Sequence, residues 1–165
     1  MVVSLSVKVF ALCASVLYAK VALTVSIQGG KTFAAGNRPP EDAKLSLAKR
    51  FPGIKQTYGA VPTEEELENK RLVRAREAEY RWKRIVMNDL ENIPMGLIVF
   101  GAGVLVEASE KVHIGAMLVF TLARLLHTYV YAYSMQPHRG LTWMIAIFAV
   151  FVGIVNTVAT GVLGN

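Results

Sequence analysis

The segment RIVMNDLENIP, from Arg84 to Pro94, places charged and amide side chains at the start of a long apolar run. An ionised side chain near the bilayer centre costs roughly 2.5–3.5 kcal/mol, so Asp89 and Glu91 are expected near the membrane interface or against a polar partner. On a helix, Arg84, Asn88 and Glu91 fall at positions i, i+4 and i+7, along one stripe. The segment therefore predicts a membrane helix whose guanidinium, amide and carboxylate could bind a zwitterionic ligand.

The composition of the whole chain agrees with a membrane protein. Its 165 residues are 53% hydrophobic with a mean hydropathy of +0.40, which is too apolar for an ordinary soluble domain. The net charge is +6, but thirteen of the 18 Lys and Arg lie between Lys31 and Arg84, among eight acids. This mixed-charge connector has no recognition motif, so we expect contact with membrane headgroups and no nucleic-acid partner. The single cysteine, Cys13, excludes an internal disulfide and a CxxC site.

Four apolar runs are each close to the roughly 20 residues that cross the hydrocarbon core. We expect an all-α, integral membrane four-helix bundle as a single domain over residues 1–165, with helices at about 2–27, 63–106, 112–133 and 141–163. The first run could be a signal peptide cut after Ala19, but retention is favoured because apolar sequence resumes after Lys20. Lys20 is expected to snorkel or to pair.

Turn and capping signals predict the helix ends. Gly29 and Gly30 are expected to end the first helix and to begin a charged connector at about 28–62. Thr63 with Glu66 forms a capping-box pattern, and no breaker follows before the apolar run. The second helix is therefore expected to begin in water and to continue into the membrane.

The distribution of basic residues predicts the orientation. The long connector with the charged half of the second helix up to Arg84, and the short connector at 134–140, together hold fourteen Lys and Arg, whereas the opposite side holds Lys111 and whatever Lys8 contributes. The positive-inside rule then places the long connector, and the extension of the second helix, in the cytosol or an equivalent compartment.

The third apolar run carries a second polar stripe. Arg124, His127, Thr128 and Tyr131 lie at i, i+3, i+4 and i+7 near the same end, and Arg139 follows in a tight loop. A plainer interpretation is that Tyr131 and Arg139 only anchor the helix ends at the interface.

Arg124 also has a structural alternative, which is an ion pair with Glu91 or Asp89 across the bundle. Two polar stripes at one depth require either mutual neutralisation or a charged ligand between them. The slight excess of cations favours a ligand with carboxylates, and a carboxylate such as Glu91 could receive an ammonium group, so a small peptide would fit.

Other kinds of site find little support. The histidines His113, His127 and His138 lack zinc-ligand spacing, so no metal is expected. No GxSxG, P-loop or HExxH motif is present.

The motif residues on the second and third helices, together with the Pro-His-Arg139 element, give the chain a resemblance to the MAPEG family, the membrane-associated proteins of eicosanoid and glutathione metabolism. The similarity is greatest to its microsomal glutathione transferase and prostaglandin E synthase branch. The segment Pro39-Pro-Glu-Asp42-Ala43 also resembles that branch.

The resemblance implies a homotrimer of four-helix bundles that binds glutathione between subunits near the cytosolic face. It implies that Arg139 lies beside the glutathione sulfur and stabilises the thiolate. It further implies a set of glutathione-binding residues: Arg84, Asn88, Glu91, Arg124, His127, Tyr131 and, just after the first helix, Lys31 or the less well aligned Arg38. The expected activity is glutathione transfer to lipophilic electrophiles or reduction of lipid hydroperoxides. The expected location is the endoplasmic reticulum, the mitochondrial outer membrane or another organelle membrane.

Three positions depart from the prostaglandin synthase pattern. Gly140 and Trp143 stand where that pattern has serine and tyrosine, and Met87 replaces a basic residue. Eicosanoid isomerisation is therefore not favoured. The alternative function is a non-catalytic membrane subunit or adaptor that uses the charged extension to attach to a larger complex. A small channel or carrier has less support, because no continuous polar face crosses all four helices.

Overall fold

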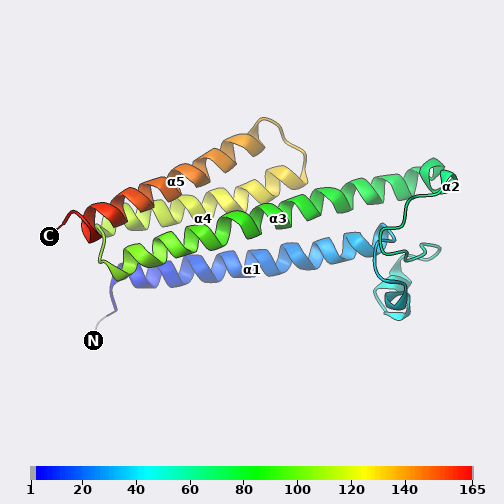
Figure 1. Cartoon of the computed structure of the whole chain (residues 1–165), viewed down its shortest axis with the longest axis horizontal. Coiled ribbons are helices and arrows are strands. Elements are labelled where there is room, and N and C mark those ends of the chain that lie inside the picture. Colours follow the sequence, from blue (N-terminus) through cyan, green and yellow to red (C-terminus); the bar gives the residue numbers. More distant parts are fainter. Residues whose placement is uncertain (1–2, 165) are drawn as a thin grey trace. The chain divides into compact units, whose positions relative to one another are not determined.

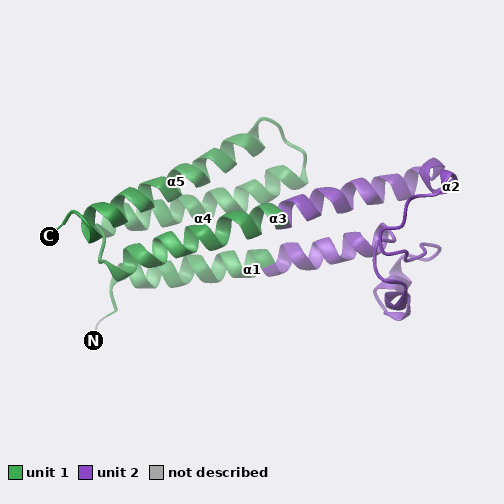
Figure 2. Ribbon diagram, viewed as in Figure 1, with its two compact units in different colours: residues 1–21, 87–165 green, residues 22–86 purple. Residues whose placement is uncertain are grey.

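A computed structural model describes residues 3–164, and this part of the chain is helical without strands. The helices are α1 (Leu5–Ala34), η1 (Pro40–Lys44), η2 (Ala48–Arg50), α2 (Glu64–Glu68), α3 (Lys70–Leu105), α4 (Glu110–Ala132) and α5 (His138–Gly161) (Figure 1). The chain forms two compact units, residues 1–21 with 87–165 (unit 1) and residues 22–86 (unit 2) (Figure 2). The prediction of an all-α fold is confirmed.

Unit 1 is a bundle in which parts of α1, α3, α4 and α5 lie side by side (Figure 2). Leu17, Phe100 and Phe120 are almost completely buried at its centre. Ala146 and Ala149 present small side chains from α5 to the same core. Small residues let helix backbones approach closely, which is how membrane helices gain packing energy.

His113 is part of this core. Its side chain is fully buried, its Nε2 lies 2.8 Å from the carbonyl oxygen of Phe100, and its ring packs edge-on against Phe100. A Cβ at Gly103 would overlap the His113 ring, so the glycine makes room for the imidazole. His113 therefore joins α3 to α4 as a packed core residue.

The protein is an integral membrane protein. Within the described residues, the three helices α1, α4 and α5 are long and apolar enough to cross a membrane. Helix α3, the fourth expected span, is not among them, because Asn88, Asp89, Glu91 and Asn92 lower the hydropathy of its apolar half.

The prediction that Gly29 and Gly30 end the first helix is wrong, since α1 continues to Ala34. Glycine in a helix interior costs only about 1 kcal/mol relative to alanine, so two glycines do not by themselves end a long helix. The helix is instead terminated just after Ala34, where Gly36 with a φ of 75° lets the Asn37 N–H donate back to the Thr32 carbonyl at 3.1 Å.

The second predicted helix, 63–106, is two helices. The predicted cap is confirmed, because the Thr63 hydroxyl accepts from the Glu66 N–H at 3.3 Å. Asn69 then leaves the helical conformation, and its side-chain oxygen accepts from the N–H groups of Arg71 and Leu72. Asn69 therefore ends α2 and caps α3, a role that is typical of asparagine.

The fourth predicted helix begins earlier than expected. Helix α5 starts at His138, so Arg139 and Gly140 lie in its first turn and not in a loop. Pro137 precedes the helix, and its carbonyl accepts from the Gly140 N–H at 3.0 Å. Helix α4 ends at Ala132, within a residue of the prediction.

Unit 2 contains an ordered connector. Buried Gln56 donates to the Phe33 carbonyl at 3.1 Å and accepts from the Arg38 N–H at 3.1 Å. Asn37 donates to buried Glu79 on α3, which also pairs with Lys83 at 3.1 Å. These bonds fix the connector against the parts of α1 and α3 that belong to unit 2.

Candidate functional site

Asp89 is the centre of a buried charge network in unit 1. It lies on α3, is completely buried, and forms ion pairs with Lys20 of α1 and Arg124 of α4. The Arg124 Nη2 donates to Asp89 Oδ1 at 2.5 Å, and the Lys20 ammonium pairs with Oδ2. Three helices are therefore joined at one carboxylate.

Arg124 also binds the neighbouring amide. The same Nη2 atom donates to the side-chain oxygen of Asn88 at 2.8 Å. The Asn88 backbone carbonyl in turn accepts from the Asn92 amide at 2.8 Å. The side-chain oxygen of Asn88 is thus bound by the guanidinium of Arg124, and its backbone carbonyl by the amide of Asn92.

The network carries an excess of positive charge, since two cations share one carboxylate. Arg124 is 0% exposed, yet its Nε and Nη1 atoms have no hydrogen-bond partner among the residues that the structure describes. A buried charge is tolerated only when it is paired, so Asp89 is what makes both cations acceptable in the core.

A second polar cluster joins α4 to the first turns of α5. His127 is buried, and its Nδ1 lies 3.2 Å from the Thr142 hydroxyl oxygen. That hydroxyl lies within hydrogen-bond distance of the carbonyl oxygens of His138, at 3.0 Å, and Arg139, at 3.1 Å. If the hydroxyl donates to these carbonyls, His127 donates from Nδ1, and its buried Nε2 is left as an acceptor without a partner among the described residues.

Arg139 stands at the edge of this cluster. Its guanidinium carbon lies 4.6 Å from the centre of the Tyr131 ring, and that ring packs edge-on against His127 at 5.7 Å. With its amide oxygen turned toward the guanidinium, Gln136 accepts two hydrogen bonds from Arg139. Arg139 is therefore a half-buried cation held by an aromatic face and an amide, in the first turn of a helix.

The structure brings some of the predicted residues together. Asn88 and Arg124 are in contact, and so are His127, Tyr131 and Arg139. The ion pair between Arg124 and Asp89 is the structural alternative that the sequence left open.

Other predicted residues make no such contacts. Glu91 is exposed on α3, and no partner for its carboxylate lies within residues 3–164. Arg84 and Lys31 belong to unit 2, where Arg84 is exposed and Lys31 is half-buried. Their part in the site stays a prediction.

Thr142 was not predicted from the sequence, and for Lys20 the sequence left two possible roles. Thr142 is a polar residue in an apolar helix and lies one turn after His138, so this spacing could have predicted that the two residues share one face of the helix. Lys20 interrupts an apolar helix in the same way. Its pairing could be suspected, but its partner depended on the packing of α1 against α3.

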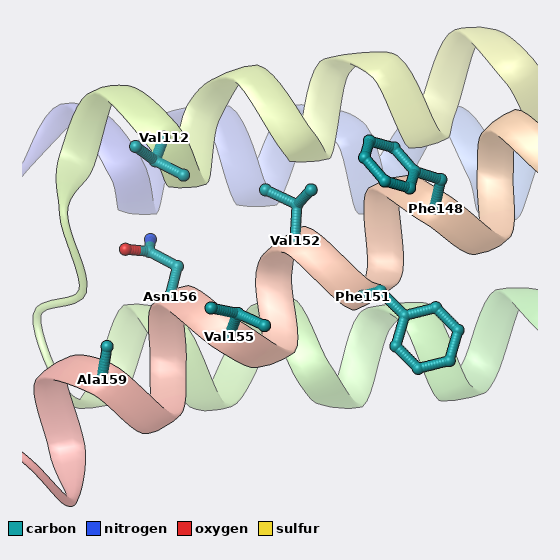
Figure 3. Close-up of a pocket in the computed structure, with 7 residues that line it drawn as sticks. All are labelled: Val112, Phe148, Phe151, Val152, Val155, Asn156 and Ala159. Carbon is teal, nitrogen blue, oxygen red and sulfur yellow. The ribbon is translucent and has the colours of Figure 1, made fainter.

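An apolar groove of about 370 Å³ lies between α4 and α5. Six of its seven lining side chains come from α5, and Val112 faces them from α4 (Figure 3). They are Val112, Phe148, Phe151, Val152, Val155, Asn156 and Ala159. The Asn156 amide donates to the Ser109 carbonyl at 3.2 Å, so the groove presents an almost entirely apolar surface.

The described residues contain no group of three His, Cys, Asp or Glu side chains that could hold a metal ion. The site consists of cations, amides, hydroxyls and aromatic rings. It is suited to binding an anionic or zwitterionic organic molecule.

The fold and this site define a helical membrane protein with a cation-rich polar core. Residues 1–159 match the model of the MAPEG family, so the chain belongs to the MAPEG family. Membership supports a role as a membrane protein of glutathione or eicosanoid metabolism. No curated protein matches the chain.

Proposed function

We propose that this protein binds glutathione and transfers it to lipophilic electrophiles, or uses it to reduce lipid hydroperoxides. The observation that carries the proposal is Arg139, a half-buried guanidinium fixed over the Tyr131 ring in the first turn of α5. Family membership and the resemblance to the microsomal glutathione transferase and prostaglandin E synthase branch support the same function.

Arg139 is proposed to stabilise the glutathione thiolate. A thiol is a weak nucleophile until it loses its proton, and a fixed cation in a partly desolvated site lowers its pKa. The N-terminus of α5 adds a partial positive charge at the same place. Tyr131 and Gln136 hold the guanidinium still, so its electrostatic effect requires little reorganisation.

The rest of glutathione would bind along α3 and α4. Asn88, with its oxygen held by Arg124, can offer its amide N–H groups to a carboxylate or carbonyl oxygen. Glu91 would receive the ammonium group, and Arg84 and Lys31 would bind carboxylates. His127 and Tyr131 would complete the site, while Arg124 would act through Asn88.

A homotrimer is part of the proposal. Glu91 is an exposed carboxylate on a face of α3 that also exposes Met87, Leu90 and Met95. An ionised carboxylate is costly against lipid, whereas the apolar side chains around it are not, and a neighbouring copy of the chain with bound glutathione would cover the charge.

The electrophile would reach the sulfur from the bilayer. The groove on α5 begins at Phe148, nine residues after Arg139, which is roughly 13 Å along a helix. An apolar tail in this groove would direct a reactive head toward Arg139. The endoplasmic reticulum and the mitochondrial outer membrane are the proposed locations.

Replacing Arg139 tests the proposal. We expect Arg139→Ala to lower the rate of glutathione conjugation to an aromatic halide by roughly 100-fold or more, because thiolate stabilisation is lost. Arg139→Lys should keep part of the rate, since it keeps the charge but not the planar fork. Arg74→Ala, an exposed arginine on α3, is the control. Unchanged conjugation by folded Arg139→Ala protein would reject this role.

The alternative function is a non-catalytic membrane subunit, and Gly140 and Trp143 at the site are what favour it. Retention on a glutathione matrix separates the two functions. A transferase should be retained and then released by free glutathione, whereas an adaptor need not bind.

A further inference from the structure

The two oxygens of the Asp89 carboxylate serve different cations. Oδ1 accepts from Arg124 and Oδ2 pairs with Lys20, whose side chain is 7% exposed. Lys20 comes from α1, whereas the other members of the network come from α3 and α4. The carboxylate is therefore fixed in its rotation by an ammonium group from a third helix.

Arg124 binds Asp89 in an unusual way for arginine. A guanidinium commonly pairs with a carboxylate through two parallel hydrogen bonds. Here one nitrogen, Nη2, serves both Asp89 and Asn88, while Nε and Nη1 have no partner among the described residues. A bidentate pair would use both oxygens of Asp89, and Lys20 already occupies the second one.

We propose that Lys20 is a positioning residue for Asn88. By occupying Oδ2, it prevents Asp89 from closing a bidentate pair with Arg124, and this leaves Nη2 on the Asn88 oxygen. Asn88 then presents its NH₂ group, which makes no hydrogen bond to the described residues, as a donor. The inference rests on the proposed function, in which this amide binds glutathione.

The first experiment is a double-mutant cycle on glutathione binding in detergent or nanodiscs. We expect Lys20→Met to weaken binding about 5- to 10-fold, the usual effect of losing one hydrogen bond. Asn88→Ala should cost about as much, and the double variant no more than either, because Lys20 acts through Asn88. Lys8→Met, at an exposed position on the same helix, should not change the affinity, and Lys20→Arg should retain it. Fully additive losses would overturn the inference.

A charge-matched variant distinguishes positioning from loss of stability. The network of Lys20, Asp89 and Arg124 carries a net charge of +1, and so does the network after Lys20→Met combined with Asp89→Asn. A carboxamide has one acceptor oxygen, so it cannot bind Arg124 bidentately, and Asn88 should stay held. We expect this double variant to recover the affinity lost in Lys20→Met. A double variant that folds but binds as weakly as Lys20→Met would contradict the mechanism.

The second experiment does not depend on glutathione. The side-chain amide signal of Asn88, assigned with Asn88→Ala in selectively ¹⁵N-labelled protein, should move in Lys20→Met and stay in place in Lys8→Met. If the signal moves but glutathione does not bind the wild type, the proposed function fails while the inference stands. A stationary Asn88 signal in folded Lys20→Met protein would overturn the inference itself.

Discussion

Asp89 is the residue on which the polar core depends. It neutralises Lys20 and Arg124, both of which are buried inside the helical bundle of unit 1. Removing one partner of a buried ion pair leaves the other charge without compensation, and this costs far more than the pair gains. Here the loss of one carboxylate would leave two buried cations.

We predict that Asp89→Ala lowers the free energy of unfolding by about 3–5 kcal/mol. Reversible unfolding in mixed micelles is the measurement. Glu91→Ala is the matched control, because it removes an exposed carboxylate from the same helix and should change stability by no more than about 0.5 kcal/mol. Equal stability of the two variants would mean that Asp89 does not hold the core together.

Single residues were predictable from the sequence only in part. The spacing of Arg124, His127 and Tyr131 indicated one polar stripe, and the contacts of His127 with Tyr131 agree with it. The choice between Asp89 and Glu91 as the partner of Arg124 was not predictable. Both are near Asn88 in sequence, and only the rotation of α3 in the bundle turns Asp89 inward and Glu91 outward.

Two glycines of α3, Gly96 and Gly101, lie in different packing environments. A Cβ at Gly96 would lie 2.5 Å from the Phe120 ring, whereas one at Gly101 would lie 3.5 Å from the Phe10 ring, an ordinary contact. The two glycines are on the same helix, and they differ in the space around them.

We predict that Gly96→Ala destabilises the protein by about 1–3 kcal/mol, because Phe120 must move from its place in the core. Gly101→Ala should be neutral or should stabilise by up to about 1 kcal/mol, since alanine favours helix. Thermal unfolding of the two variants side by side checks this. A larger loss for Gly101→Ala would show that the packing of α3 differs from that described.

The short helix α2 is held to α3 by an ion pair between Glu66 and Arg76 at 2.8 Å. The hydrogen bond from Arg76 lowers the pKa of Glu66 below its ordinary value of 4.5. A lowered carboxyl pKa contributes stability above the ordinary value, and that contribution is lost as the pH falls through the lowered pKa. The attachment of α2 should therefore be complete at neutral pH.

We predict that the NMR titration midpoint of the Glu66 carboxyl rises toward its ordinary value in Arg76→Gln. Arg74→Gln, at an exposed position two residues before Arg76 on the same helix, should leave the midpoint unchanged. The same midpoint in wild type and in Arg76→Gln would rule out the ion pair as the cause.

The boundaries of the helices show what the sequence can and cannot predict at this scale. Thr63 was recognised as a cap because its hydroxyl and Glu66 have the spacing that a cap requires. Gly29 and Gly30 were mistaken for an end, because glycine lowers helix stability by only about 1 kcal/mol per residue and does not by itself stop a long helix. Helix α1 ends at Ala34, and the turn that follows it needs the positive φ of Gly36.

For the whole molecule, the apolar composition and the four runs were sufficient to predict a helical membrane protein. The family came from the resemblance of the motif residues on the second and third helices, and the match of residues 1–159 to the MAPEG model confirms it. The homotrimer and the glutathione site stay proposals, because they depend on surfaces that a single chain leaves open. The exposed Glu91 and the apolar side chains near it are the features that a trimer would cover.

The most direct test of the central claim is the ultraviolet absorbance of the glutathione thiolate, recorded while glutathione is titrated into the purified protein near neutral pH. We expect a thiolate signal that saturates with the wild type, and no signal with Arg139→Ala even where glutathione still binds. A wild-type protein that gives no thiolate signal at saturating glutathione would contradict the claim.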